Sequence, residues 1–270
     1  MSDMERKNSF SIIDLHIESC GGELLFHKKK LDLFAGEIIL LVGQSGVGKS
    51  TFLKAIAGLL DENQWRLSGK IETSGKSIDL QTNREGIGAL VFQDFALLPW
   101  RSVEGNVSLV LEDHDLDAAR RAEIIDDVLG RTKLLDFKKN LPRQLSGGMK
   151  QRVAIARALA VNPAVLLMDE PLSALDSQTS ELLIDDLVEL WTREAFTACY
   201  VTHNLAEAVR LGHKVAVFSR RPGKIREIVD IDIPLAERTA THPALEEIRK
   251  HLWELMREEA QAADLELTDA

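Results

Sequence analysis

Residues 43–50 read Gly43-Gln44-Ser45-Gly46-Val47-Gly48-Lys49-Ser50, which matches the pattern G-x-x-x-x-G-K-[ST] in full. The apolar run Ile38 to Val42 precedes the motif, and a helix from Lys49 to Leu60 is expected after it. Glycines let such a loop curl until several backbone N–H groups point at one spot, next to the positive end of a helix. We therefore predict a nucleotide-phosphate site at Gly43 to Thr51, where Lys49 reaches the β- and γ-phosphates and Ser50 ligates Mg²⁺.

A second apolar run ends in two acids. Residues 165–168 read Val-Leu-Leu-Met and are followed by Asp169 and Glu170. In a parallel sheet, ligands gather at the carboxyl ends of the strands. Asp169 is expected to hold Mg²⁺ directly or through water. Glu170 points differently, and its carboxylate can orient or deprotonate a water molecule in line with the γ-phosphate.

The composition argues against nucleic-acid-binding, membrane-spanning and secreted disulfide-rich proteins. The 270 residues include 33 Lys and Arg against 43 Asp and Glu, a formal net charge of −10, which argues against a nucleic-acid binder with a general basic surface. The longest apolar stretches have about five residues, whereas a spanning helix needs roughly 20. Met1 to Lys7 lack the apolar core of a signal peptide. Two cysteines, Cys20 and Cys199, are too few for a disulfide framework, so a cytosolic location is expected.

Short apolar runs recur at wide intervals, at residues 38–42, 88–92, 164–168, 197–202 and 214–218. Runs that do not alternate with polar residues fit strands buried on both faces of a parallel sheet. Helical patterns lie between them, including one at residues 180–195. An α/β core with crossover helices is therefore predicted.

The chain between these runs divides into three expected parts. The α/β core takes residues 8–94 and 153–225. Residues 95–152 form a helical subdomain, because they hold an amphipathic helix at 117–129 and no convincing strand. Residues 226–270 form a tail with a loop and one helix, in which Pro243 suits the first helical position.

A second loop of small residues, Ser146-Gly147-Gly148, precedes a helix expected at 153–160. Small residues at a helix N-terminus form an anion site. One chain that binds one nucleotide has no evident use for two such cradles. Two copies arranged head to tail do, because each chain's Ser-Gly-Gly loop can close over the other's nucleotide. A symmetric dimer with two equal composite sites is therefore expected.

Several of these motifs together resemble the ATPases of ABC transporters. Leu145 to Gly148, followed by Gln-Arg-Val-Ala-Ile-Ala-Arg-Ala-Leu from Gln151, resembles the family's signature. Leu166 to Asp176, which reads Leu-Leu-Met-Asp-Glu-Pro-Leu-Ser-Ala-Leu-Asp, looks like its Walker B strand and D-loop. Gln93 and His203 match its Q-loop glutamine and switch histidine. The matches follow the family's order between residues 36 and about 219.

The resemblance implies a fold and a role for each matched residue. The fold would be an α/β P-loop NTPase core with a mainly parallel sheet, an N-terminal antiparallel β subdomain and an inserted helical subdomain. The ligand would be ATP with Mg²⁺, hydrolysed to ADP and phosphate. Gln93 would contact Mg²⁺ or the attacking water, His203 would contact the γ-phosphate, and Asp176 would be the acid of the D-loop.

A narrower resemblance concerns cargo. Residues 96–103 and 218–225 are similar to segments of ATPases that serve nitrate, sulfonate, taurine and related small-molecule importers. This implies transmembrane permease subunits, an extracytoplasmic solute-binding protein, and a peripheral position on the cytoplasmic face of the inner membrane. Pro99 and Trp100 would help to form the groove for a permease's coupling helix, and the alternative is a turn with a packed aromatic. The alternative functions are lipid trafficking or export, and a soluble ABC-type ATPase without a transport role.

The chain departs from the family pattern where adenine is bound. Family members usually stack adenine on an aromatic side chain shortly after the first strand, and this chain has Cys20-Gly21-Gly22 there. Phe10 and Phe26 are the candidates for a replacement, and the sequence does not choose between them. Stacking on a base is worth about 1–3 kcal/mol, so loose base selectivity is expected.

Overall fold

Six strands form the main sheet, in the order β10-β9-β3-β8-β7-β6. Their bounds are β3 (Ile38–Val42), β6 (Gly88–Val91), β7 (Val165–Asp169), β8 (Ala198–Val201), β9 (Lys214–Phe218) and β10 (Ile225–Asp230). The first five are mutually parallel, and β10 is antiparallel to β9. All five predicted runs are strands, with ends within one residue of the predicted ends. This computed structural model describes the chain except residues 1–9, 74–75, 81–87, 220–222, 240 and 269–270. The expected start of the core at residue 8 and part of the importer-like segment 218–225 therefore lie outside the described residues.

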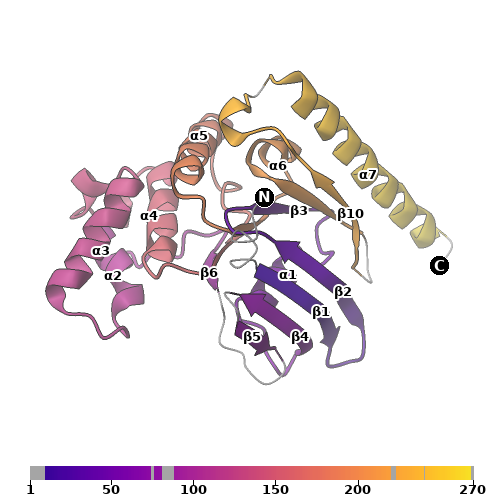
Figure 1. Ribbon diagram of the computed structural model, residues 1–270, viewed down its shortest axis with the longest axis horizontal. Helices are drawn as coiled ribbons and strands as arrows, with labels where there is room; N and C mark the ends of the chain where they lie inside the picture. Colours follow the sequence, from indigo (N-terminus) through magenta and orange to yellow (C-terminus); the bar gives the residue numbers. More distant parts are fainter. Residues whose placement is uncertain (1–9, 74–75, 81–87, 220–222, 240, 269–270) are drawn as a thin grey trace.

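Four strands form a second, antiparallel sheet in the order β2-β1-β4-β5. They are β1 (Phe10–Ser19), β2 (Leu24–Leu33), β4 (Trp65–Thr73) and β5 (Lys76–Asp79). Figure 1 shows this sheet below the main one. The helices of residues 103–159, called the helical lobe from here on, lie to one side, and the last helix lies across the opposite end. The N-terminal antiparallel β subdomain implied by the resemblance is confirmed.

The central strand β3 is apolar at every position because both of its faces are buried. Ile38, Leu40 and Val42 belong to the core on the side of the large helices. Ile39 and Leu41 belong to a second core, which includes the antiparallel sheet and the first helix. Since successive strand residues point to opposite faces, burial of both faces requires an unbroken apolar run.

Seven α-helices connect or cover the sheets of the described chain. They are α1 (Lys49–Ile56), α2 (Val103–Ser108), α3 (Ala118–Arg131), α4 (Gly147–Leu159), α5 (Ser177–Glu194), α6 (Leu205–Leu211) and α7 (Pro243–Thr268). Asp117 and Asp176 cap α3 and α5 through hydrogen bonds to backbone N–H groups, which fixes where these helices begin. None of the described helices has the length and hydropathy that a membrane crossing needs.

Two elements differ from the expectation. Helix α4 begins at Gly147, six residues before the expected start, because the Ser146 hydroxyl accepts a hydrogen bond from Met149 N and caps the helix there. It therefore runs through the expected boundary between residues 152 and 153. The tail also contains β10, where only a loop was expected. Its sequence, Ile-Arg-Glu-Ile-Val-Asp, has no apolar run, because an edge strand pairs through its backbone and is not buried on both faces.

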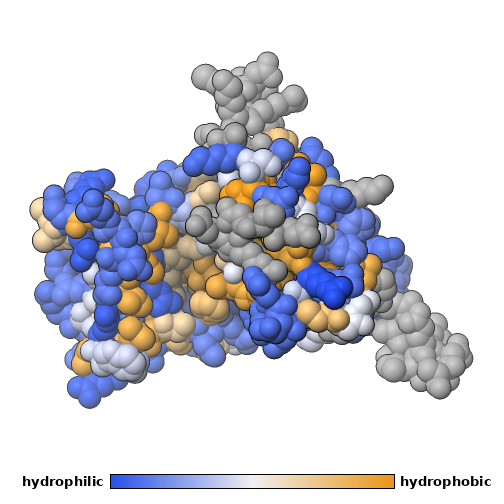
Figure 2. Space-filling model, turned by 90° about the horizontal axis from the view of Figure 1, so that it is seen from below, coloured by the Kyte–Doolittle hydropathy of each residue, from blue (hydrophilic) through white to orange (hydrophobic). Residues whose placement is uncertain are grey.

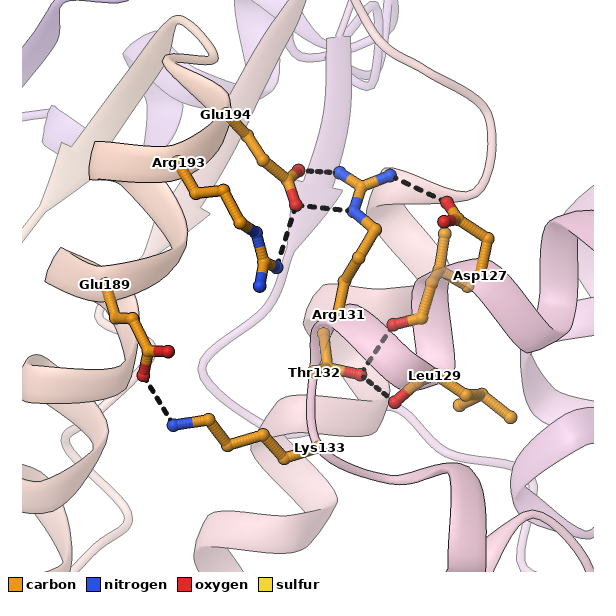
Figure 3. A network of polar contacts seen from close by, with 9 residues as sticks. Asp127, Leu129, Arg131, Thr132, Lys133, Glu189, Arg193 and Glu194 are labelled. Atoms are coloured by element: carbon orange, nitrogen blue, oxygen red, sulfur yellow. Dashed lines mark hydrogen bonds and ion pairs between the residues drawn. The ribbon is translucent and has the colours of Figure 1, made fainter.

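Charged side chains join the helical lobe to α5 of the core. Arg131, at the end of α3, donates from Nε to Glu194 Oε1 at 2.7 Å, and its Nη2 bonds the other oxygen of Glu194. Lys133 donates to Asp186 at 2.9 Å and to Glu189 at 2.6 Å. Figure 3 shows Arg131 reaching to Glu194, and Lys133 reaching to Glu189, across the gap between α3 and α5. The lobe is thus held to the core by ion pairs as well as by apolar contacts.

Candidate functional site

The loop between β3 and α1 has the backbone shape that its glycines predict. Gly46 and Gly48 have φ values of 80° and 104°, a region that residues with a Cβ rarely adopt. A Cβ at Gly48 would also lie 3.2 Å from Leu25 Cγ. Gly48 is the N-cap of α1, so the positive end of this helix faces the loop. Of the other predicted contacts, Gln44, Ser45 and Gly46 lie at the accessible rim, Val47 is buried, and Gly43 and Thr51 flank the loop.

Lys49 is buried, with 6% of its surface exposed. Its ammonium group donates to Gly43 O at 2.8 Å and to Gln44 O at 2.7 Å, so it lies against the inside of the loop. Burial lowers the pKa of Lys49, and the nearby carboxylates of Glu170 and Asp169 oppose that shift. The predicted position of a cation in the phosphate cradle agrees with this geometry.

Ser50 and Asp169 meet although 119 positions separate them in the sequence. Ser50 Oγ donates to Asp169 Oδ1 at 2.8 Å, which joins the start of α1 to the end of β7. Burial raises the pKa of Asp169, while the Ser50 hydroxyl lowers it. A hydroxyl and a carboxylate are hard oxygen donors, which Mg²⁺ prefers, and a cation would offset the cost of burying this charge. The two residues therefore fit a Mg²⁺ site.

Glu170 has an unusual backbone conformation at the end of β7. Its φ is 45°, which costs a non-glycine residue of order 1–3 kcal/mol, and backbone strain of this kind is enriched at functional sites. Its N–H donates to Val201 O at 3.0 Å, and its carbonyl accepts hydrogen bonds from the backbone N and the hydroxyl of Ser173. Its Oε2 lies 3.1 Å from His203 Nδ1. The predicted pair Glu170 and His203 is thus in direct contact.

Gln93 follows β6, whose last residue Val91 pairs with Met168 of β7. Its side chain is exposed at the edge of the sheet where Asp169 and Glu170 lie. Arg157 of α4 donates to Ala96 O at 2.5 Å and to Phe95 O at 3.2 Å, which ties the segment after Gln93 to the helix of the signature. The motifs did not single out Arg157 for this role.

The Ser146-Gly147-Gly148 loop opens α4 and packs against the start of α5. A Cβ at Gly147 would lie 2.8 Å from Leu175 Cδ2, and one at Gly148 would lie 2.9 Å from Thr179 Cγ2. A larger residue at either position would therefore have to displace the side chain of Leu175 or Thr179, so the glycines allow α4 to start close to the D-loop and α5. Helix α4 belongs to the lobe and α1 to the sheets, so the two predicted anion cradles lie in different parts of the chain (Figure 1).

Three other residues singled out from the sequence have structural roles in the described chain. Asp176 accepts hydrogen bonds from Thr179 N at 3.0 Å and Thr179 Oγ1 at 2.7 Å, so it caps α5. Phe10 and Phe26 are both buried, and Phe26 stacks on Phe218 with ring centroids 5.2 Å apart. Neither ring therefore has a free face for adenine.

Sequence patterns also missed a buried carboxylate near His203. Glu207, in the first turn of α6, accepts hydrogen bonds from the hydroxyls of Tyr200 and Thr202. The sequence could have indicated this residue only by its place, as a single acid four residues after His203 among the mainly apolar residues of a short helix.

The family model, two related sequences and one related structure that match this chain all carry names of transporter or import proteins. The sequence model of the family described as ABC transporter matches residues 26–173. The aliphatic sulfonates import ATP-binding protein of Bacillus subtilis is 38% identical over 240 residues, which is 89% of each chain. The nitrate import ATP-binding protein of Synechocystis sp. is 42% identical over 204 residues, 76% of this chain and 74% of that one. The structure of cbiO1 from Clostridium perfringens, described as part of the ABC transporter complex cbiONQ, matches with a TM-score of 0.72 and 28% identity over 94% of this chain and 98% of that one.

Proposed function

Because the chain belongs to the family of ABC transporter ATP-binding proteins and is an ATPase of that kind, we propose that it is the ATP-hydrolysing subunit of a small-solute importer. The observation that carries the proposal is the hydrogen bond between Ser50 and Asp169. It joins the phosphate-binding loop to the strand end that also presents Glu170. Binding groups and a proton acceptor thereby meet at one edge of the sheet.

The loop and α1 bind the nucleotide. Backbone N–H groups of residues 43–51 surround the phosphates, and Lys49 donates to the β- and γ-phosphate oxygens. Ser50, Asp169 and Gln93 would hold Mg²⁺, which supplies neutralisation of charge on the phosphate oxygens when it is bound.

Glu170 acts on the attacking water. Its carboxylate accepts a proton as the water oxygen bonds to the γ-phosphorus, and the bond to the β-phosphate oxygen breaks, which yields ADP and phosphate. An ionised carboxylate only accepts hydrogen bonds, so His203 donates to Glu170 from Nδ1. A hydrogen bond from His203 Nε2 to a γ-phosphate oxygen then requires the ring to carry a proton on both nitrogens, because a neutral ring with its proton on Nδ1 has only an acceptor at Nε2.

A second copy of the chain completes each site. Ser146, Gly147 and Gly148 of one protomer close over the nucleotide held by Lys49 of its partner, with Asp176 in the adjoining D-loop. The separation of the two cradles within one chain supports this arrangement, because a single chain presents them in different parts of the fold.

The partner of the closed dimer is a pair of transmembrane permease subunits. Trp100, with 73% of its surface exposed, follows the Gln93 segment and is not the packed aromatic of the alternative interpretation. Figure 2, the view from below, shows apolar surface between the hydrophilic residues of the helical lobe. Docking of a permease there would hold the chain on the cytoplasmic face of the membrane.

The relatives support the class of cargo. Two of them carry names of sulfonate and nitrate importers, so the cargo proposed here is a small solute of that kind, delivered by an extracytoplasmic binding protein. Binding of taurine, an alkanesulfonate or nitrate to the binding protein that co-purifies with the permease supports the proposal. A complex that exports lipid would contradict it.

Hydrolysis is tested with Glu170→Gln in the purified full-length chain. The variant keeps the side-chain volume but loses the proton acceptor, so ATP binding stays and turnover falls by about 10²-fold or more. Glu181→Gln is the matched control, because Glu181 lines the same pocket and pairs with Arg210 at 3.1 Å instead of facing His203. Unchanged turnover in Glu170→Gln would sink the role given to Glu170.

A further inference from the structure

A buried carboxylate lies directly behind the segment that carries His203. Glu207 is only 6% exposed, and one of its oxygens, Oε2, accepts hydrogen bonds from Thr202 Oγ1 at 2.8 Å and Tyr200 Oη at 3.0 Å. Burial raises the pKa of Glu207, while both hydroxyls lower it. An apolar side chain at this position would avoid the free-energy cost of removing a carboxylate from water. The presence of a carboxylate here therefore indicates a specific role for it.

The hydrogen bonds of Thr202 continue from Glu207 to both sides of His203. Thr202 N donates to Leu41 O of β3 at 3.2 Å. Thr202 Oγ1, while it donates to Glu207, accepts a hydrogen bond from Asn204 N at 2.9 Å. The carboxylate of Glu207 therefore orients a hydroxyl that closes the turn around His203.

His203 depends on this turn for its position. Its side chain is 63% exposed, and its ring contacts Glu170 at 3.1 Å from a surface location. An exposed ring receives little restraint from packing, so the backbone on either side must set where it points.

We propose that Glu207 is the positioning residue of His203, acting through the hydroxyl of Thr202. Tyr200, on the strand β8 (Ala198–Val201) that leads into Thr202, fixes the carboxylate with its own hydroxyl. Glu207 touches neither nucleotide nor water in this scheme. The inference rests on the role proposed above for His203. It adds that a buried carboxylate sets the orientation of the exposed histidine ring.

The test compares steady-state ATP hydrolysis by full-length Glu207→Ala, Glu207→Gln and Thr202→Val. A misplacement of about 1 Å can cost about 10²-fold in rate, so we expect kcat of Glu207→Ala to fall 10- to 100-fold with KM for ATP nearly unchanged. Glu207→Gln keeps an acceptor oxygen and should recover most of the loss. Thr202→Val, which leaves Glu207 in place, should lose as much as Glu207→Ala. Wild-type kcat in both Glu207→Ala and Thr202→Val would overturn the inference.

A matched control separates positioning from loosening of α6. Val209→Ala removes buried volume from the same helix, 4% exposed, and touches none of the polar groups. It should lower the melting temperature while kcat remains near wild type. If Val209→Ala lowers kcat as much as Glu207→Ala does at equal loss of stability, the inference is overturned.

A double variant distinguishes failure of this inference from failure of the proposed function. If Glu207 acts through His203, adding Glu207→Ala to His203→Ala should cause no further loss of kcat. Independent, multiplying effects would overturn the inference while leaving His203 in its role. Wild-type turnover in His203→Ala alone would instead overturn the role of His203, and the inference with it.

Discussion

Lys49 is held against the inside of the phosphate-binding loop. Its ammonium group donates to the carbonyls of Gly43 and Gln44, and burial lowers its pKa. Carbonyl groups are neutral acceptors, whereas ionised phosphate oxygens add the attraction of opposite charges to the hydrogen bonds that the ammonium group donates. Exchange of one set of partners for the other therefore favours a bound nucleotide.

Lys49→Ala should weaken ATP binding by about 10- to 100-fold, because hydrogen bonds to charged groups are worth about 1.5–3 kcal/mol each. Titration calorimetry with ATP measures the change. Lys70→Ala is the control, since Lys70 is exposed on β4 of the antiparallel sheet. Equal affinities of the Lys49 and Lys70 variants would contradict the position of Lys49 in the cradle.

At the scale of elements, α3 and α5 form the joint between the helical lobe and the core. Arg131 and Glu194 make a two-bond ion pair there, with side chains 28% and 17% exposed (Figure 3). Such partly buried, forked geometry is where an ion pair contributes measurable stability. Movement of the lobe on nucleotide binding would have to displace or carry this pair.

A double-mutant cycle with Arg131→Gln and Glu194→Gln should give a coupling of about 1 kcal/mol in urea unfolding, which shrinks at high salt. The pair Arg120 and Glu123, on α3 with side chains 58% and 67% exposed, is the control and should show almost no coupling. No difference between the two cycles would show that the pair of Arg131 and Glu194 adds no measurable stability to the joint.

The elements also show what could and could not be predicted. Strands such as β3 could be predicted because burial of both faces leaves an unbroken apolar run. Asp169 could be predicted because it ends such a run, and Lys49 because its glycine-rich motif follows one. Edge strand β10 lacks that run. Glu207 was missed because its importance comes from two hydroxyls on the preceding strand and turn, which no local pattern in α6 records.

At the scale of the whole molecule, the tail is fastened to the core around Gly212 and His213. The guanidinium of Arg238, 3% exposed, donates to Ile233 O at 2.8 Å and Ile231 O at 3.1 Å in the tail, and also to Gly212 O. His213 Nδ1 accepts a hydrogen bond from Ile38 N at 3.1 Å. The tail thus contacts Gly212, and the neighbouring His213 contacts β3, the strand that leads into the phosphate-binding loop.

Burial, and then the charge of Arg238, lower the pKa of His213. Below pH about 6.5 the unfolded chain takes up a proton here that the folded chain does not, so the free energy of unfolding falls as pH falls. The slope from this group is at most about 1.4 kcal/mol per pH unit. Urea unfolding at several pH values should show a smaller slope for His213→Asn, which keeps an acceptor for Ile38 N. His114→Asn, which removes an exposed histidine, should leave the slope as in the wild type.

Closure of two copies around ATP is the central claim, and the molar mass of Glu170→Gln tests it most directly. Light scattering on the variant with Mg²⁺ and ADP should give the mass of one chain, 30.1 kDa. With Mg²⁺ and ATP, which binds but is not hydrolysed, it should give twice that mass. A single-chain mass with ATP bound would contradict the shared site formed by Lys49 and Ser146.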